Sequence, residues 1–520
     1  MDEDYTLEDM GDKQTLLQGK SFEEKKVEEL KPNLRKDIWD FILLVILYFL
    51  QGIPLGLALG SLPFLLKSKM TYSDMAIFSI TNYPYSMKLL WSPIVDSFFN
   101  KKFGRRKSWI VPIQLCSSFF MFFFGGIIND KMDEKKIPIG FITAYFTIMV
   151  ILSATQDIAL DGWALELLSK ENLSYASTAQ TVGLNTGQFL SSTVFLAFNS
   201  AEFSNKYLRS KPSEYGVLQL GPYLKFWAVC YFLVTLYLIV IKKEKICYDV
   251  IESIKEVYKI MWKVIKLPRM RSFIVLLFIA KIGFVTNDAV TSLKLLEKGF
   301  KREDLSVTVL IDFPLQIIFG YYAAKWSSGK RPLRPWMWAF YGRIAAAILA
   351  MFVVKFFRIP ENGEISSGYF ILIILSTVLS SFMSTVQFVS IGCFFARIAD
   401  PTVGGTYMTL LNTLSNLGGT WPRPLILEGV DVLTDYGECQ GLSSDIQGIT
   451  CKTSDGRHDC ISNGGQCEII SDGYYNISIV CIILALLSLF LFIKKEVRNL
   501  ETTPKHYWEI PKDKDEKEKD

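Results

Sequence analysis

DFILLVILYFLQGIPLGLALGSLPFLL, residues 40–66, is the first of many long apolar stretches in this chain. After Asp40 it carries no charged residue. Because the hydrocarbon core of a bilayer needs roughly 20 apolar residues per helix, this stretch is long enough to span a membrane. Half of the 520 residues are hydrophobic, and the 21% that are charged crowd into the two ends and a few short segments. The composition therefore predicts a polytopic membrane protein rather than a soluble one.

The apolar stretches form two sets of six, which predict about 12 transmembrane helices. The first set lies at 39–66, 74–98, 108–128, 137–160, 176–200 and 222–241. The second set lies at 271–293, 304–326, 335–357, 366–394, 403–428 and 474–493. Two six-helix halves joined by a long linker are the layout of the major facilitator fold, in which a pseudo-two-fold axis along the membrane normal relates the halves.

We therefore expect an all-α membrane protein with five parts. They are a disordered tail at 1–38, an N-terminal six-helix bundle at 39–241, a linker at 242–270, a C-terminal six-helix bundle at 271–493 with a loop at 430–473, and a second tail at 494–520. Basic residues are dense at 101–107, 242–271 and 325–334. The positive-inside rule places these segments, and with them both termini, in the cytoplasm. Lys294, Lys298, Lys301 and Arg302 would then lie on the opposite side, mixed with acidic residues.

An internal repeat supports two related halves. The matched pairs, at an offset of 230 or 227 residues, are Gln51 with Lys281, Asn82 with Asp312, Asp74 with Asp304, Pro84 with Pro314, and Asn185 with Asn412. The polar pairs fall near the middle of helices that line the central cavity in this fold. Polar groups at that depth cost several kcal/mol unless they are satisfied, so they face a cavity or one another.

Two interpretations of these central residues stay open. In the structural one, Lys281 and Asp312 form an interior ion pair among hydrogen-bonded amides. In the functional one, Lys281 offers a positive site to an anionic substrate, and Asp312 is its counter-ion when the site is empty. Further basic and aromatic residues are candidates for the same binding site: Lys88, Trp91, Arg343 and Arg423.

A second set of charged residues predicts a gate at the cytoplasmic side. Asp96 ends the second span and is followed by FGRRK at 103–107, which matches the facilitator loop of Gly104, Arg105 and Arg106. Asp157 and Asp161 lie four residues apart, and hence on one face of a helix that ends toward the cytoplasm. Acidic groups are disfavoured at a helix C-terminus, so we expect Arg105 and Arg106 as their partners. The alternatives are purely topogenic charges in the loop and proton transfer by the two acids.

Four cysteines crowd into the loop at 430–473. Cys439, Cys451, Cys460 and Cys467 fall within 29 residues, without paired CxxC spacing and with only His458 nearby. Clustered cysteines of this kind indicate either two disulfides or a metal site, and the spacing favours disulfides. Disulfides would place this loop on an oxidising, non-cytoplasmic side.

Catalytic motifs are missing from the sequence. It contains no Walker A pattern, no HExxH and no GxSxG, and its two histidines lie outside the predicted spans. We therefore expect neither an enzyme nor an ATP-driven pump, and no cofactor or metal. The net charge of +4 gives no strongly basic surface for nucleic acid.

Several segments together resemble the acetyl-coenzyme A transporter family of the endoplasmic reticulum membrane, which is a solute carrier group of the major facilitator superfamily and is similar to bacterial muropeptide permeases. The likeness runs from about Trp39 through the twelfth span. The segments that carry it are LQGIPLGL at 50–57, KLLWSP at 88–93 with Asp96, FGRRKSW at 103–109, ATQD at 154–157, DGWAL at 161–165, YAST at 175–178 and NKYLR at 205–209.

The resemblance implies a transporter that carries acetyl-CoA from the cytosol into the lumen, in exchange for CoA, to supply lumenal acetylation. Its partners would be acetyl-CoA, CoA and the lipid bilayer, and a homodimer stays open. Other hypotheses are a carrier of another bulky organic anion, such as oxidised glutathione or a muropeptide, or a membrane receptor or scaffold that transports nothing. The phosphate groups of CoA suit Lys281, Arg343 and Lys88, and its adenine suits an aromatic such as Trp91.

Overall fold

The computed structural model describes residues 34–510, with gaps in that range. The gaps are residues 68, 135–136, 170–171, 173, 245–253, 328–330, 359–364, 400–403, 441–450, 452, 454–455, 458, 461–462 and 464. The outer parts of both predicted tails and His458 therefore lie outside the described residues. The described chain is mostly helical, as the composition predicts.

The N-terminal half contains six helical rods. Three are continuous helices: α7 (Lys107–Asp133), α8 (Ile139–Leu167) and α12 (Leu220–Val240). The first rod joins α2 (Ile38–Gly56), the π-helical η2 (Leu57–Ser61) and α3 (Leu62–Lys67). The second joins α4 (Tyr72–Phe78), η3 (Ser79–Asn82), α5 (Tyr83–Met87), η4 (Lys88–Leu90) and α6 (Ser92–Ser97). The fifth joins α9 (Ser174–Phe189), η6 (Leu190–Val194) and α10 (Phe195–Asn199), and α11 (Ala201–Tyr207) follows it.

The C-terminal half repeats this arrangement. Its continuous helices are α17 (Arg302–Ser327), α18 (Leu333–Phe356) and α19 (Ser367–Ile398). The interrupted rods consist of α14 (Pro268–Ile279), η7 (Ile282–Phe284), α15 (Val285–Ala289) and α16 (Thr291–Glu297), then α20 (Gly404–Thr420) and α21 (Pro422–Val432), and finally α23 (Gly473–Ser488), η9 (Leu489–Ile493) and α24 (Lys494–Thr502). An amphipathic helix, α13 (Ile254–Ile265), lies between the halves in the chain.

In the described part of the chain, nine helical segments are long and apolar enough to cross a membrane. The other three predicted spans correspond to the rods at 72–97, 174–199 and 404–432. Each of these is interrupted or carries polar residues that face the interior, such as Asn82 and Gln180. Interrupted and polar helices are tolerated at membrane depth where they line a protein interior.

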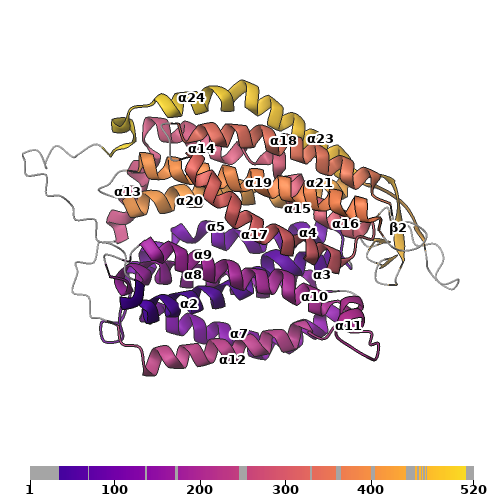
Figure 1. Ribbon diagram of the computed structural model, residues 1–520, viewed down its shortest axis with the longest axis horizontal. Helices are drawn as coiled ribbons and strands as arrows, with labels where there is room; N and C mark the ends of the chain where they lie inside the picture. Colours follow the sequence, from indigo (N-terminus) through magenta and orange to yellow (C-terminus); the bar gives the residue numbers. More distant parts are fainter. Residues whose placement is uncertain are drawn as a thin grey trace, which may run out of the picture.

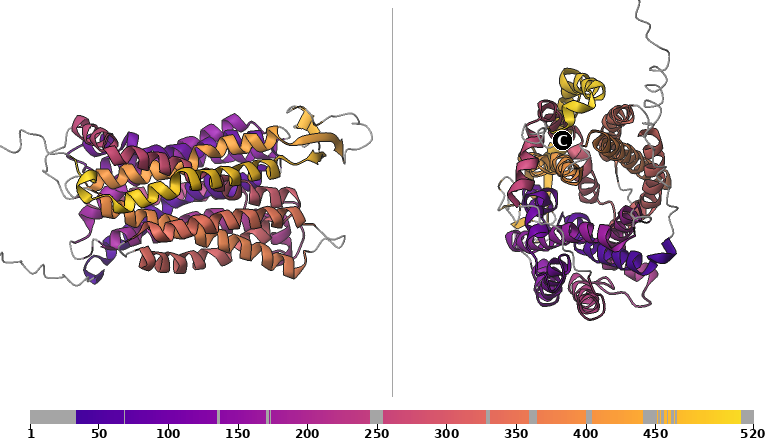
Figure 2. Two further views of the ribbon diagram at one scale, coloured as in Figure 1. Left: turned by 90° about the horizontal axis from the view of Figure 1, so that it is seen from above. Right: turned by 90° about the vertical axis from the view of Figure 1, so that its left-hand side faces the viewer.

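The rods run side by side along the long axis of the molecule (Figure 1). The N-terminal half, indigo to magenta, lies below the C-terminal half, which is coloured toward orange and yellow. We call the end that carries α13 the linker face. The opposite end carries the hairpin of β1 (Asp435–Gln440) and β2 (Gln466–Ser471), and we call it the disulfide face. Figure 2 shows the same bundle from above and from its linker face.

Glycines bring the first and fifth rods into close contact. A Cβ atom at Gly52 or Gly56 would collide with the backbone of residues 184–188 on α9, and a Cβ at Gly183 or Gly187 would collide with the backbone of α2. Small residues at four-residue spacing allow membrane helices to approach closely and to pack by van der Waals contact. These contacts hold α2 and α9 close together beside the site described below.

The start of α2 is tied to the end of α8. Asp37, just before α2, accepts hydrogen bonds from the Ser169 backbone N–H at 2.9 Å, the Ser169 hydroxyl at 2.5 Å and Asn172 Nδ2 at 2.7 Å. The bonds from Ser169, followed by those from Asn172, hold the pKa of this carboxyl below its ordinary value.

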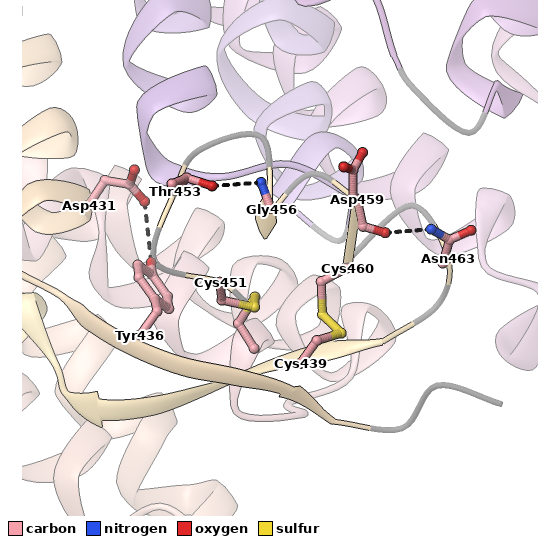
Figure 3. The surroundings of a disulfide bond; sticks show 10 residues. Asp431, Tyr436, Cys439, Cys451, Thr453, Gly456, Asp459, Cys460 and Asn463 are labelled. Atoms are coloured by element: carbon pink, nitrogen blue, oxygen red, sulfur yellow. Dashed lines mark hydrogen bonds between the residues drawn. A yellow bond between two sulfur atoms is a disulfide. The ribbon is translucent and has the colours of Figure 1, made fainter. Parts of the chain in front are cut away.

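The loop on the disulfide face is cross-linked twice. Cys439 pairs with Cys460 and Cys451 pairs with Cys467, each with a Cα–Cα distance of 5.8 Å. Figure 3 shows the disulfide between Cys439 of β1 and Cys460, with Tyr436 donating to Asp431 at the end of α21. The structure thus has the two disulfides that the clustering favours, and no thiolate is left in this cluster for a metal.

Charged residues connect the two halves at the disulfide face. Lys67 of α3 lies 3.1 Å from Glu297 of α16, and Ser73 of α4 donates to Asp431 of α21 at 2.7 Å. Lys294 pairs with Glu297 at 2.8 Å and with Asp472 at 2.7 Å. Of the basic residues that conflicted with the predicted orientation, Lys294 and Lys301 thus have acidic partners, the latter in Glu202. We call the Lys67–Glu297–Lys294–Asp472 chain the ionic latch.

Candidate functional site

A cluster of charged side chains lies inside the N-terminal half, centred on Asp157 of α8. The Asp157 side chain is 0% exposed and forms an ion pair with Lys88. Its carboxylate also accepts hydrogen bonds from Gln51 Nε2 at 2.7 Å and from the Tyr85 hydroxyl at 3.3 Å. A buried carboxylate needs such partners because desolvation of a lone charge costs several kcal/mol.

Asp161 lies one helical turn further along α8. It accepts hydrogen bonds from the Tyr48 hydroxyl and from Gln180 Nε2, both at 2.8 Å, and Lys88 Nζ lies 3.9 Å away. Its side chain is 42% exposed, in contrast to Asp157. We call Lys88, Asp157 and Asp161 the N-half cluster. One lysine thus serves two carboxylates, which leaves an excess of negative charge.

Interruptions in the second rod position Lys88. The residue stands where α5 gives way to the short 3₁₀ turn η4, between Pro84 and Pro93. Proline removes a backbone donor and breaks a regular helix, and the change of helix type turns Lys88 toward α8. The amine lies 5.2 Å from the centre of the Tyr85 ring, which adds a cation–π contact.

A second cluster lies in the C-terminal half around Asp288 of α15. Arg343 of α18 forms an ion pair with Asp288 and donates to Gln387 Oε1 of α19 at 3.0 Å. The guanidinium lies 4.4 Å from the centre of the Phe284 ring. Arg343 is buried, and its Nε has no hydrogen-bond partner among the described residues. This buried cation has donor capacity that the described protein groups do not use.

Two more cations lie within electrostatic range of the same carboxylate without forming an ion pair with it. Lys281 feels the charges of both Arg343 and Asp288, and its amine donates to the Ser415 carbonyl at 2.7 Å. Arg423 also feels the charge of Asp288, and both residues line one small cavity between the halves. Arg423 donates to Asn82 Oδ1 at 3.4 Å. We call Asp288, Lys281, Arg343 and Arg423 the C-half cluster, in which three cations face one anion.

The expected Lys281–Asp312 ion pair is wrong for this conformation. Asp312 accepts a hydrogen bond from Gln316 Nε2 at 2.7 Å, one turn along its own helix, and interacts with Ser381. Lys281 instead points to α20. The anion near Lys281 is Asp288, two turns further along the same rod, and the repeat could not reveal it because residue 58, its counterpart at an offset of 230, is an alanine.

The expected pairing of Arg105 or Arg106 with Asp157 is also wrong, whereas the charge of Arg106 does act on Asp161. Asp157 pairs with Lys88, and Arg106 forms an ion pair with Glu166, whose Oε1 lies 2.9 Å from its Nε. The reason is depth. Arg106 stands at the start of α7 on the linker face, beside Gly162 and the last turns of α8, whereas Asp157 lies deeper in the bundle.

Other predicted residues lie around these clusters. Gly104 has a left-handed φ of 106°, with the Glu244 side chain close to it, and Glu244 accepts from the backbone N–H groups of Arg106 and Lys107 at 2.9 Å each. Arg105 lies 6.0 Å from the Phe99 ring centre. The side chain of Asp96 lies outside the described residues.

The remaining predicted binding residues, Asn185, Asn412 and Trp91, are not members of either cluster. Asn185 on α9 is half-buried and Asn412 on α20 is exposed. Trp91 donates to Thr155 at 3.1 Å and lines an apolar groove with Leu90 and Trp109. The structure therefore brings Gln51 and Lys88 into one cluster, and Lys281, Arg343 and Asn82 into contact with the other, but it does not bring Trp91 to either.

Sequence reasoning missed several partners in both clusters. They are Tyr48, Tyr85, Gln180, Asp288 and Gln387. Asp288 could have been found from the sequence, because burying a lone acid within an apolar span costs free energy and therefore indicates a functional or paired group. The tyrosines and glutamines carried none, since only the fold shows which helix faces they share.

The arrangement is suited to holding an anion. The C-half cluster presents more positive than negative charge in an interior from which water is partly excluded, where guanidinium groups bind phosphate and carboxylate oxygens most strongly. The N-half cluster has the opposite balance.

Residues 40–252, 248–334 and 329–510 match the family model described as Acetyl-coenzyme A transporter 1. An uncharacterized membrane protein of Saccharomyces cerevisiae is 44% identical over 550 residues, covering 91% of this chain and 98% of that protein. An uncharacterized protein of Schizosaccharomyces pombe is 41% identical over 467 residues, covering 90% and 88%. The anhydromuropeptide permease of Escherichia coli is 27% identical over 150 residues, covering 29% of each chain.

Solved transporters share the fold at low sequence identity. The nucleoside transporter NupG superposes with a TM-score of 0.57 at 12% identity, covering 89% of this chain and 99% of that one. A bacterial homolog of the human lysosomal transporter Spinster gives a TM-score of 0.56 at 12% identity, covering 90% and 99%. These likenesses confirm the predicted major facilitator fold. With the family match over nearly all of its length, the chain belongs to the acetyl-coenzyme A transporter family of polytopic membrane transporters.

Proposed function

We propose that the protein carries acetyl-CoA from the cytosol into the lumen of the endoplasmic reticulum, in exchange for CoA, and so supplies lumenal acetylation. The observation that carries the proposal is the C-half cluster, where Arg343 pairs with Asp288 and the charges of Lys281 and Arg423 also act on that carboxylate. A substrate with several phosphates is the kind of ligand that such an excess of buried cations can hold. The family match supports acetyl-CoA as that ligand.

The direction rests on the predicted orientation. The linker face carries the basic segments that the positive-inside rule assigns to the cytoplasm, and the opposite face carries two disulfides, which form in oxidising compartments such as the lumen. Epitope tags at both termini should be reached by antibody after selective permeabilisation of the plasma membrane, and a tag in the loop at 441–450 should not. The reverse pattern would overturn the proposed direction.

Uptake by proteoliposomes tests the substrate. Labelled acetyl-CoA should enter vesicles that contain the purified protein, and CoA trapped inside should accelerate this uptake. Uptake that is equally fast without internal CoA would contradict exchange, and absence of uptake in both would contradict the substrate.

A matched pair of lysine variants links transport to the cluster. Lys281→Met removes one cation while Arg343 still pairs with Asp288, so it should weaken acetyl-CoA binding by about tenfold, the scale of one charge-assisted contact. Lys131→Met removes a lysine from an exposed pair with Glu134 on the disulfide face and should leave binding unchanged. If the two variants bind acetyl-CoA with equal affinity, Lys281 does not contribute to the binding site.

A carrier of another bulky organic anion is the second candidate function. It is favoured by the partial likeness to the anhydromuropeptide permease, which extends over 29% of this chain. Competition decides between the two candidates, because a muropeptide or oxidised glutathione that displaces labelled acetyl-CoA at lower concentration than CoA does would be the better substrate.

A further inference from the structure

A polar cavity of about 310 Å³ lies inside the C-terminal half. It is lined by α15, α16, α17, α18 and α19, and we call it the side cavity. Hydroxyl and amide side chains form much of its wall. They include Ser376, Thr377, Ser380, Ser384, Asn287 and Gln316. Cavities of this size in proteins are large enough for a small-molecule ligand or for part of a larger one.

One hydroxyl in the wall is open to the cavity. Ser376 lines the side cavity and the residue as a whole is 5% exposed, and no hydrogen bond joins its hydroxyl to any of the described residues. The hydroxyl oxygen itself is not fully buried, so it is accessible to whatever occupies the cavity. Thr377 and Thr385, by comparison, bond to carbonyls of their own helix. The Ser376 hydroxyl can therefore donate a hydrogen bond to a ligand in the cavity and accept one from it.

The side cavity begins at the C-half cluster. Asp288 belongs to both, since it pairs with Arg343 and also lines the cavity. Gln387, which receives the other hydrogen bond from Arg343, lies three residues after Ser384 on α19 and hence on a neighbouring part of the same helix face. A ligand whose phosphates occupy the cluster would therefore have the cavity directly beside it.

The character of the wall changes with distance from the cluster. Along α19 the lining runs from Thr385 back to Ile373, which is about 18 Å at 1.5 Å per residue. Hydroxyl groups occupy the stretch near the cluster, and apolar residues occupy the end toward the disulfide face: Leu295, Leu305, Val353 and Ile373. The cavity thus offers cations, then hydrogen-bonding groups, then an apolar end.

We propose that the side cavity receives the uncharged, amide-bearing arm of the substrate while the C-half cluster holds its phosphates. This inference rests on the proposed function. The pantetheine arm of acetyl-CoA leaves the phosphates, presents two amides and ends in an acetyl thioester. Serine and threonine hydroxyls bond to amide N–H and C=O groups, and the apolar end suits the thioester and its methyl group. The side cavity is then the part of the site that distinguishes CoA compounds from nucleotides that carry the same phosphates.

The test compares two ligands on two variants of the full-length protein. The ligands are acetyl-CoA and adenosine 3′-phosphate 5′-diphosphate, which keeps the phosphates of CoA and lacks the arm. The first variant combines Ser376→Ala with Ser384→Ala, and the second, Ser384→Leu, fills the cavity. Ser390→Ala is the matched control, since Ser390 is a buried serine of the same helix that bonds to Ser327 outside the cavity.

Both cavity variants should weaken acetyl-CoA binding by about tenfold or more, the scale of one or two lost hydrogen bonds, and should leave binding of the arm-less nucleotide within about twofold. The control should bind both ligands like the parent. Equal weakening of both ligands, or unchanged acetyl-CoA binding in both variants, would overturn the inference.

The parent protein separates this result from a failure of the proposed function. If the parent binds acetyl-CoA no more tightly than the arm-less nucleotide, the proposed site for the arm is contradicted, but the proposed phosphate site is not. A parent that binds neither ligand would overturn the proposed function and the arm site together.

Discussion

Replacing Lys88 by methionine tests the electrostatic core of the N-terminal half. The substitution keeps the approximate volume of the side chain and removes the cation that pairs with Asp157, whose side chain is 0% exposed. Breaking a buried pair from one side leaves an uncompensated charge and costs about 3–5 kcal/mol. At about 2 °C per kcal/mol, the lower end for large domains, we expect the unfolding midpoint to fall by roughly 6–10 °C.

A compensating change separates charge from packing. In the double variant Lys88→Met with Asp157→Asn, the fully buried charge is removed together with its partner, and the side-chain amide that replaces the carboxylate can still accept a bond from Gln51 or Tyr85. Asp161 also loses Lys88, but it is 42% exposed and keeps its hydrogen bonds from Tyr48 and Gln180. We expect its midpoint to recover to within about 2 °C of the parent, since the residual loss is about one neutral hydrogen bond. Lys131→Met is the control, because its pair with Glu134 is exposed and worth at most about 0.5 kcal/mol.

Thermal unfolding of the purified protein, followed by the fluorescence of its 11 tryptophans, measures all three variants. If Lys88→Met unfolds at the same temperature as Lys131→Met, the buried ion pair is not the feature that stabilises this bundle. If the double variant is as unstable as the single one, the apolar stem of Lys88 and its contact with the Tyr85 ring matter more than its charge.

Three further predictions concern the two faces of the molecule. Mass mapping without reduction should find Cys439 linked to Cys460 and Cys451 to Cys467; any other pairing would contradict the fold of this loop. Glu297→Gln should loosen the ionic latch, so that a cysteine introduced by Ser292→Cys reacts faster with a thiol reagent added at the disulfide face, and an unchanged rate would show that the latch does not hold the halves together. Hydrogen bonds lower the pKa of Asp37 in the folded state, so its contribution to stability is present above the unfolded pKa of about 3.9 and is lost as the pH falls through the lower folded pKa. Asp37→Asn should therefore destabilise the protein at about pH 7 and progressively less as the pH falls below about 3.9, and a pH-independent loss would contradict this.

The fold class could be predicted from the sequence because bilayer thickness fixes the length of an apolar span. The predicted spans overlap the helical rods of the structure throughout the described chain. What hydropathy could not reveal is that several rods change helix type, as the first does at Leu57–Ser61 and the second does at Lys88. Those changes depend on local packing and on prolines, and they determine where the polar side chains point.

The candidate site was predictable in part. Lys281, Arg343, Lys88 and the two acids of α8 stood out because charges are rare within spans. Their pairing was not predictable, because the repeat relates positions of equal depth in the two halves, whereas Lys281 interacts with Asp288 of its own rod and Lys88 with an acid of α8. Depth along a helix follows from residue number, but direction around it follows only from the packed structure.

The opposite charge balance of the two clusters bears on how exchange would work. Buried cations in excess of their anions are costly, so an empty C-half cluster favours any conformation in which water or an anion reaches Arg343 and its unpartnered Nε. Acetyl-CoA and CoA carry the same phosphates and would relieve that cost equally. In the proposed exchange, the cluster would therefore favour return of the carrier with a bound anion, but it would not distinguish the two compounds. Discrimination has to arise where they differ, at the acetyl end of the arm, and in this structure the apolar end of the side cavity near Ile373 is the place where that end would lie.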